Sequence, residues 1–181
     1  PIMLSATISM QSGRTISGQS LEAFVTSVSH ARLLSLGLNC SFGAENLLPH
    51  VAKLGQISPF YISAHPNAGL PNAQGQYEGT PIIMGQQIAQ YISRGLVNII
   101  GGCCGTTPAH IAVYSKLVQG AKPHERANSP TSDLVLSGRE VLRLPSAQGI
   151  LEVINKPDER SQRFQTLVEE KQYNKALSIA Q

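Results

Sequence analysis

Short apolar segments alternate with amphipathic segments through the first two-thirds of the chain, and this alternation constrains the fold more than any other feature. Each apolar segment suits one strand, and each amphipathic segment carries apolar residues near helical spacing. Four strand–helix units in this order predict an α/β fold with a parallel sheet, in which chemistry lies at the carboxyl ends of the strands. The expected strands are 1–9, 36–40, 59–64 and 96–101, and the expected helices are 21–34, 44–54, 84–94 and 108–118.

The composition is that of a globular protein with large buried surfaces, because 41% of the residues are apolar and only 14% are charged. The net charge of +3 comes from scattered Lys and Arg residues, so nucleic acid is not an expected partner. The longest apolar runs are shorter than the roughly 20 residues of a membrane span. No signal peptide is recognisable, and we therefore expect a cytoplasmic protein with no membrane partner.

A change in composition marks the end of the alternating region. Residues 120–133 are polar and contain proline, which is typical of a linker. A short apolar stretch, a strand-like segment at 149–154 and charged helical sequence from 158 onward come after it. The predicted organisation is a β/α domain at 1–120, a linker at 121–148 and a separate tail at 149–181.

The three cysteines lie where the predicted fold places its chemistry. Cys40 ends the second expected strand, and Cys103 and Cys104 follow the fourth. An odd number of cysteines argues against a closed disulfide framework. In a β/α barrel these strand ends converge on one mouth, so three thiolates are available to a zinc ion. Catalytic zinc sites have three protein ligands and one open position, where a thiol substrate becomes a thiolate nucleophile.

A structural interpretation of the cysteines competes with the metal site. Free cysteines are often small buried core residues with no ligand. The flanking glycines favour the metal site, since they let the backbone turn sharply beside a ligand. From spacing alone both interpretations remain open.

Three other residues are candidates for substrate binding. Asn39 precedes the first cysteine and could contact metal or substrate, or only support its neighbours. His65 lies at the carboxyl end of the strand predicted at 59–64 and could line the pocket, or be an ordinary hydrogen-bonded loop histidine. Gly102 stands beside the cysteine pair, where backbone conformation is the alternative role.

Several segments together resemble a known family. The stretches GLNC at 37–40, HPNAGLPN at 65–72 and GGCCGTTP at 101–108 closely resemble the homocysteine-binding module of cobalamin-dependent methionine synthases. The segment SGRT at 12–15 fits as well, and the similarity extends from residue 1 to about 120. The paired cysteines are also typical of the wider group of zinc-dependent homocysteine methyltransferases. The tail at 149–181 resembles the start of the pterin-binding domain of methionine synthases.

The resemblance implies a (β/α)8 barrel in which Cys40, Cys103 and Cys104 hold Zn²⁺. It implies that homocysteine sulfur takes the fourth position and attacks the methyl group of methylcobalamin, which other modules bind. The product is methionine.

A complete barrel of this family has eight strands, and the chain holds about four, which resemble the fifth to the eighth. We therefore expect the first four strands and the downstream folate and cobalamin modules to act as partners. Open sheet edges favour association, and we expect isolated turnover to be weak or absent. Two alternatives stay open. The methyl donor could be betaine or S-methylmethionine, or the chain could be a non-catalytic truncated remnant that binds metal.

Overall fold

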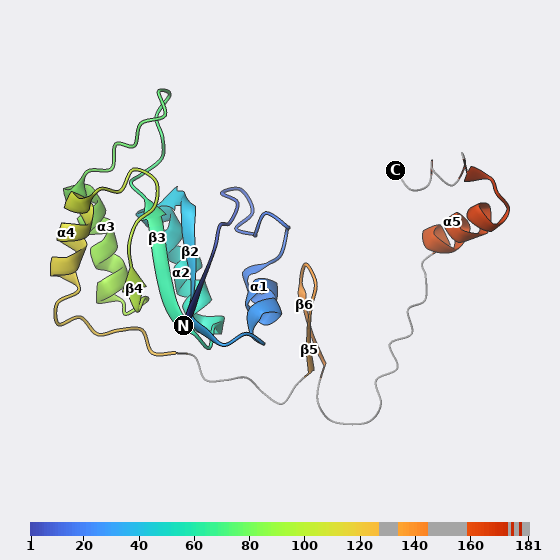
Figure 1. Cartoon of the computed structure of the whole chain (residues 1–181), viewed down its shortest axis with the longest axis horizontal. Coiled ribbons are helices and arrows are strands. Elements are labelled where there is room, and N and C mark those ends of the chain that lie inside the picture. Colours follow the sequence, from blue (N-terminus) through green and yellow to red (C-terminus); the bar gives the residue numbers. More distant parts are fainter. Residues whose placement is uncertain (127–133, 145–158, 174, 176–177, 179–181) are drawn as a thin grey trace. The chain divides into compact units, whose positions relative to one another are not determined.

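The computed structural model describes residues 1–126, 134–144, 159–173, 175 and 178. The chain divides into two compact units, residues 1–146 and residues 147–181, and each is described here by itself. The first unit contains the sheet and most of the helices (Figure 1).

A parallel four-stranded sheet in the order β1-β2-β3-β4 forms the centre of the first unit. Because consecutive strands are neighbours and crossovers of this kind are right-handed, the connecting helices lie on one face of the sheet. This arrangement confirms the predicted α/β fold and is consistent with part of a β/α barrel. The elements are β1 (Ile2–Ala6), α1 (Leu21–Val28), β2 (Leu33–Gly43), α2 (Ala44–Ile57), β3 (Tyr61–Asn67), α3 (Pro81–Ser93), β4 (Ile99–Ile100) and α4 (Pro108–Leu117).

Strand β1, helix α1 and strand β4 are clearly shorter than expected. Helix α1 ends at Val28, where the Ser29 hydroxyl donates to the carbonyl of Val25 at 2.6 Å. Strand β4 has only two residues, although the backbone N–H of the preceding Asn98 still donates to the Ile62 carbonyl of β3 at 2.8 Å. The Asn98 Oδ1 accepts from the backbone N–H of Ile62 at 2.8 Å.

The core lies between the sheet and helices α2 and α3. The Tyr91 side chain is fully buried, and its hydroxyl donates to the carbonyl of Ala44 at the start of α2. Burial raises the pKa of that hydroxyl well above its ordinary value. Each large apolar side chain buried here contributes roughly 1.5–3 kcal/mol. The fully buried core residues include Leu36, Leu38, Leu47, Val51, Leu54, Ile62, Met84 and Ile88.

A β-hairpin packs against α1 within the range 121–148 that the sequence predicts to be a linker. Its strands are β5 (Leu134–Ser137) and β6 (Val141–Leu144). The Ser137 hydroxyl donates to the carbonyl of Ala23 at 2.6 Å, and Glu140 forms an ion pair with Arg14 at 2.5 Å. The hairpin therefore ties the loop after β1 to the first helix.

The second unit contains helix α5 (Glu159–Glu169), which falls in the charged sequence expected to be helical. The strand-like segment at 149–154 lies outside the described residues. Among the residues that the structure describes, no helix has the length and apolar character that crossing a membrane requires.

Candidate metal centre

Cys40 lies at the end of β2, where the strand becomes irregular. The pairing of β2 with β3 shifts between Asn39 and Gly43, so the backbone bulges there. Cys40 and Ser41 both have positive φ angles, 63° and 55°. Non-glycine residues adopt this left-handed conformation at a cost of about 1–2 kcal/mol each. Such strain concentrates at functional sites, and here it turns the Cys40 thiol toward the loop after β4.

Hydrogen bonds from the end of β3 position the second pair of cysteines. The Cys103 backbone N–H donates to the carbonyl of Pro66 at 2.8 Å. The Cys104 backbone N–H donates to the side-chain oxygen of Asn67 at 3.1 Å, and the Cys104 carbonyl accepts from Ala68 at 2.8 Å. The loop after β4 is therefore attached to the strand that separates it from Cys40.

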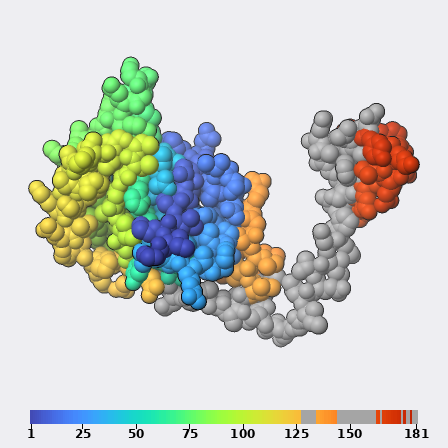
Figure 2. All heavy atoms as spheres, viewed as in Figure 1, coloured from blue at the N-terminus to red at the C-terminus, as the bar shows by residue number. Residues whose placement is uncertain are grey.

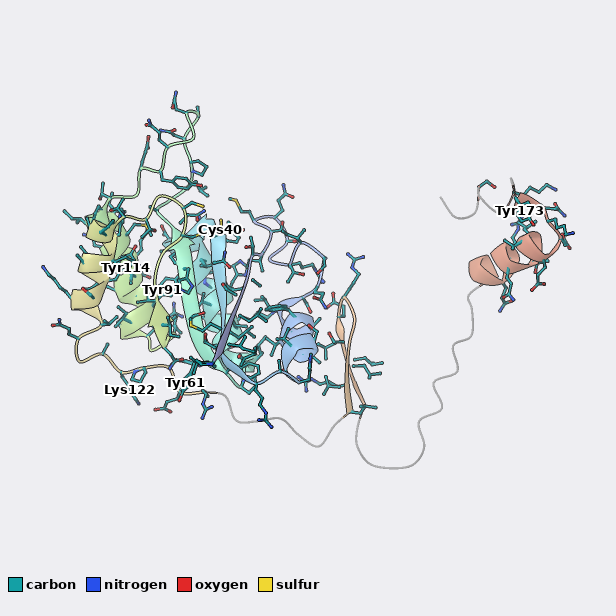
Figure 3. All side chains as sticks on the ribbon, viewed as in Figure 1. Cys40, Tyr61, Tyr91, Tyr114, Lys122 and Tyr173 are labelled. Atoms are coloured by element: carbon teal, nitrogen blue, oxygen red, sulfur yellow. The ribbon has the colours of Figure 1, made fainter. Side chains whose placement is uncertain are left out.

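The three thiols meet at this end of the sheet. The Cys40 and Cys104 sulfurs are 3.8 Å apart, and the Cys103 and Cys104 sulfurs are 3.9 Å apart. All three sulfurs lie within 4.8 Å of one another. A zinc–sulfur bond of about 2.3 Å in tetrahedral geometry gives a sulfur–sulfur separation of about 3.8 Å, so the trio fits this ion. Figure 3 shows Cys40 at this end of the sheet, among the loops that follow the strands.

The electrostatics of the trio favour a negative charge at Cys40. Burial opposes that charge, but hydrogen bonds from the Ser41 backbone, the other two thiols and Asn67 outweigh it and lower the pKa of Cys40. The pKa of Cys103 is raised, first by burial and then by the neighbouring thiols. All three cysteines are partly exposed, which gives an incoming ligand access to the sulfurs.

Asn67 and Tyr77 also lie close to the thiols, although neither was predicted to bind metal or substrate. The buried Asn67 amide holds the Cys104 backbone and lies beside the Cys40 thiol. The Tyr77 ring lies against Gly105, and the nearby Cys104 thiol is the main cause that raises the pKa of the Tyr77 phenol. Asn67 ends the observed strand β3, three residues beyond the strand predicted at 59–64, and Tyr77 stands in a long loop with no signal in the sequence.

The candidate substrate residues lie around the trio in different settings. Asn39 is directed at β1, where its side chain accepts from the Ser5 hydroxyl at 2.6 Å and donates to Thr7 at 3.4 Å. The half-buried His65 ring packs against Gly101, and burial lowers the pKa of His65. A side chain at Gly102 would come within 2.2 Å of the Thr106 hydroxyl, so this position requires glycine for close packing.

Comparison with known families agrees with this geometry. The model of the homocysteine S-methyltransferase family matches residues 1–118, which include the whole sheet and all three cysteines. The chain belongs to the homocysteine S-methyltransferase family. Membership in this family supports methyl transfer to homocysteine as the general chemistry, and the trio of thiols is the part of the fold suited to hold a metal such as zinc.

Proposed function

We propose that this chain carries the zinc-dependent step of homocysteine methylation, with methylcobalamin as the methyl donor and methionine as the product. The observation that carries the proposal is the separation of the sulfurs, 3.8 Å and 3.9 Å, which matches a tetrahedral zinc site. Cys40, Cys103 and Cys104 would hold the ion, as the family match over residues 1–118 supports.

Zinc bound by three thiolates supplies one open position, where a substrate thiol loses its proton and stays nucleophilic at neutral pH. The residues of the chain position the three sulfur ligands. The bulge at Cys40 and the bonds from Pro66 and Asn67 hold the three sulfurs at the spacing the ion needs before it binds. A preformed ligand set avoids ordering the loop at the moment of binding.

The identity of the methyl donor is the second part of the proposal. Methylcobalamin is favoured by the HPNAGLPN stretch and by the sequence after residue 133, which resembles methionine synthases. Betaine and S-methylmethionine are the donors to test against it. Asn39, His65 and Gly102 keep their proposed places near the substrate, with Gly102 acting through its backbone.

Binding of homocysteine to the full 181-residue chain tests the proposal. Titration calorimetry should show binding to the zinc-loaded chain, release of protons, and no binding to the metal-free chain. Homoserine, which has a hydroxyl in place of the thiol, should not bind. Equal binding of homoserine and homocysteine would contradict the proposal, because the metal would then have no role in recognition.

A second assay separates the donors. Zinc-loaded chain and homocysteine are mixed with methylcobalamin, betaine or S-methylmethionine, and methionine is measured. We expect slow formation of methionine above the background, and only with methylcobalamin. Methionine formed from betaine or S-methylmethionine would show that this compound, and not methylcobalamin, is the methyl donor. Binding of zinc without binding of homocysteine would favour the non-catalytic alternative, a remnant that binds metal.

A further inference from the structure

We infer that His110 is a positioning residue of the metal centre, whose ring bridges the start of helix α4 and the loop at 68–80 and so holds that loop against Cys104. The inference rests on the proposed zinc site and concerns how the cysteine loop is kept in place. The loop at 68–80 connects β3 to α3 and projects from the surface as the green segment of Figures 1 and 2.

The His110 ring makes a hydrogen bond through each of its nitrogens. Its Nδ1 accepts from the Thr107 backbone N–H at 3.1 Å, so the ring hydrogen lies on Nε2. Nε2 then donates to the Gly79 carbonyl at 2.7 Å. A backbone N–H can only donate and a carbonyl can only accept, so this assignment satisfies both partners. His110 is only 4% exposed, which gives the link little freedom to move.

The loop at 68–80 is in turn fastened to the cysteines at its base. The Gly79 backbone N–H donates to the Ala68 carbonyl at 2.9 Å, and the Ala68 backbone N–H donates to the Cys104 carbonyl at 2.8 Å. A Cβ atom on Gly79 would come within 2.5 Å of the Ala68 carbonyl carbon, so the two sides of the loop are in close contact. Three hydrogen bonds therefore lead from the His110 ring to the Cys104 backbone.

These bonds and the backbone form a closed circuit around the end of the cysteine loop. Thr107 follows Cys104 by three residues and is the N-cap of α4. The Thr107 backbone N–H is bonded to His110, and the Cys104 carbonyl is bonded to Ala68. The segment at 104–107 is therefore held at both ends, and loss of the His110 ring would free one of them.

Packing around this segment leaves it little room to adjust. Gly105 has a φ of +77°, and a Cβ atom there would come within 2.3 Å of the Tyr77 Cβ. On the other side, a Cβ atom on Gly102 would come within 2.2 Å of the Thr106 hydroxyl. Because closely packed segments transmit displacement instead of absorbing it, a shift at one end should move the other end.

The place of His110 in α4 allows its two bonds to be separated. It occupies the third position of the helix, where a side chain that accepts from the N-cap N–H completes a capping box. The Nδ1 atom fulfils this role for α4, whereas the Nε2 atom serves the loop at Gly79. A substitution that keeps only the first bond therefore tests the second.

The test is His110→Asn in the full chain, because the asparagine oxygen stands near the place of Nδ1 and the side chain is too short to reach Gly79. In His110→Gln the terminal amide stands near the place of Nε2 and can donate to Gly79 again. The matched control is His124→Asn. His124 also bonds to two carbonyls, those of Gly95 at 2.9 Å and Gly55 at 3.2 Å, where α3 and α2 end.

Zinc affinity is measured by competition with a chromogenic chelator, and cobalt-loaded chains report the ligand geometry through the sulfur-to-cobalt charge-transfer band. Loss of a residue that orients metal ligands typically lowers metal affinity about 10- to 100-fold, so we expect a loss of about tenfold and a shifted band in His110→Asn. His110→Gln should bind zinc more tightly than His110→Asn, and His124→Asn should match the original chain.

Unchanged affinity and an unchanged band in His110→Asn would overturn the inference while leaving the zinc site intact. Equal losses in His110→Asn and His110→Gln, or an equal loss in His124→Asn, would also overturn it, because the bond to Gly79 would not be the cause. Failure of the original chain to bind zinc would overturn the inference and the proposed function together.

Hydrogen exchange in the unaltered chain covers the case in which His110→Asn does not fold. If the bond to Gly79 favours zinc, zinc must stabilise that bond to the same extent. The His110 Nε2–H and the Gly79 amide should therefore exchange about tenfold more slowly once zinc is added. The reference is the Asn98 amide, which donates to Ile62 near the other end of β3 and should slow less. Equal slowing at all these sites would refute the coupling of His110 to the metal centre.

Discussion

At the scale of single residues, the metal centre depends on sulfurs that local backbone geometry brings together. Cys40 reaches the trio through two consecutive residues with positive φ. Cys103 and Cys104 reach it through hydrogen bonds to Pro66 and Asn67. The metal site therefore depends on the end of β3 as much as on the cysteines themselves.

Replacing one thiol tests the ligand set. In Cys103→Ser, loss of one of three protein ligands should lower zinc affinity at least about 100-fold, measured by chelator competition. Circular dichroism of the metal-free chains should be unchanged, because Cys103 is partly exposed and outside the core cluster. Zinc affinity equal to that of the original chain would exclude Cys103 as a ligand.

Asn67 should contribute to stability through the Cys104 loop. In Asn67→Ala, the Cys104 backbone N–H loses its hydrogen-bond partner. The residue that is changed is only 4% exposed. Losing such a buried hydrogen bond should cost about 1–3 kcal/mol in the free energy of unfolding. Urea denaturation of the metal-free chain measures it, with Gln74→Ala at the exposed tip of the same loop as a control. An equal loss in both variants would show that the Cys104 contact has no special role.

The positions of the cysteines follow from the sequence, but their supports do not. Strand–helix alternation predicts that residues 40, 103 and 104 lie at one end of a sheet. The bulge at Cys40 and the packing of Tyr77 against Gly105 are tertiary features. No local sequence pattern predicts either feature, because each depends on residues that are far apart in the sequence.

At the scale of elements, close packing between β2 and β3 sets the spacing of the site. Gly37 pairs with Ser63, and a Cβ at Gly37 would come within 2.3 Å of the Ser63 carbonyl oxygen. A strand of larger residues would therefore separate the two strands that carry Cys40 and Asn67.

Gly37→Ala should destabilise the first unit by about 1–3 kcal/mol or more, because the clash is with backbone that cannot rotate away. The control is Gly138→Ala, where the added carbon would lie 3.9 Å from the Glu140 carbonyl oxygen, an ordinary van der Waals contact. Thermal unfolding compares the two variants. Equal melting temperatures would contradict the packing seen between β2 and β3.

The hairpin supplies a prediction on pH. The Arg14 guanidinium lowers the pKa of Glu140 below its ordinary value of 4.5. Because the unfolded state binds the proton more readily, the stabilisation from this pair is present above pH 4.5 and decreases as the pH falls below that value. The effect should be small, since the Glu140 side chain is 64% exposed.

Melting temperatures between pH 6 and pH 3 test this point. The melting temperature of Glu140→Gln should fall less steeply with acidification than that of the original chain. The two melting temperatures should converge at the lowest pH. A steeper fall in the variant would show that the ion pair does not stabilise the folded hairpin.

The short strands β5 and β6 have only four residues each, which explains why composition at 121–148 indicates a linker and misses them.

At the scale of the whole molecule, the described sheet has two outer strands, β1 and β4. Strand β1 presents apolar residues at its edge of the sheet, with Ile2 58% exposed and Met3 51% exposed. An open apolar edge favours pairing with another strand. The parallel order of the sheet was predictable from the alternation of elements, and its open edges from the small number of strands, whereas the identity of the exposed apolar side chains required the coordinates.

We expect the 181-residue chain to self-associate as its concentration rises, which sedimentation velocity would detect. Met3→Lys should reduce the association, because a charge on an edge strand disfavours strand pairing. The control is Met10→Lys, where a methionine that is 53% exposed lies in the loop after β1. Equal association of both variants would place the contact elsewhere on the surface.

Zinc K-edge X-ray absorption of the loaded chain, with and without homocysteine, tests the central claim most directly. We predict three sulfurs at about 2.3 Å from the zinc and one lighter atom before homocysteine is added, and four sulfurs afterward. Fewer than three sulfurs at the start, or a spectrum that homocysteine leaves unchanged, would contradict it.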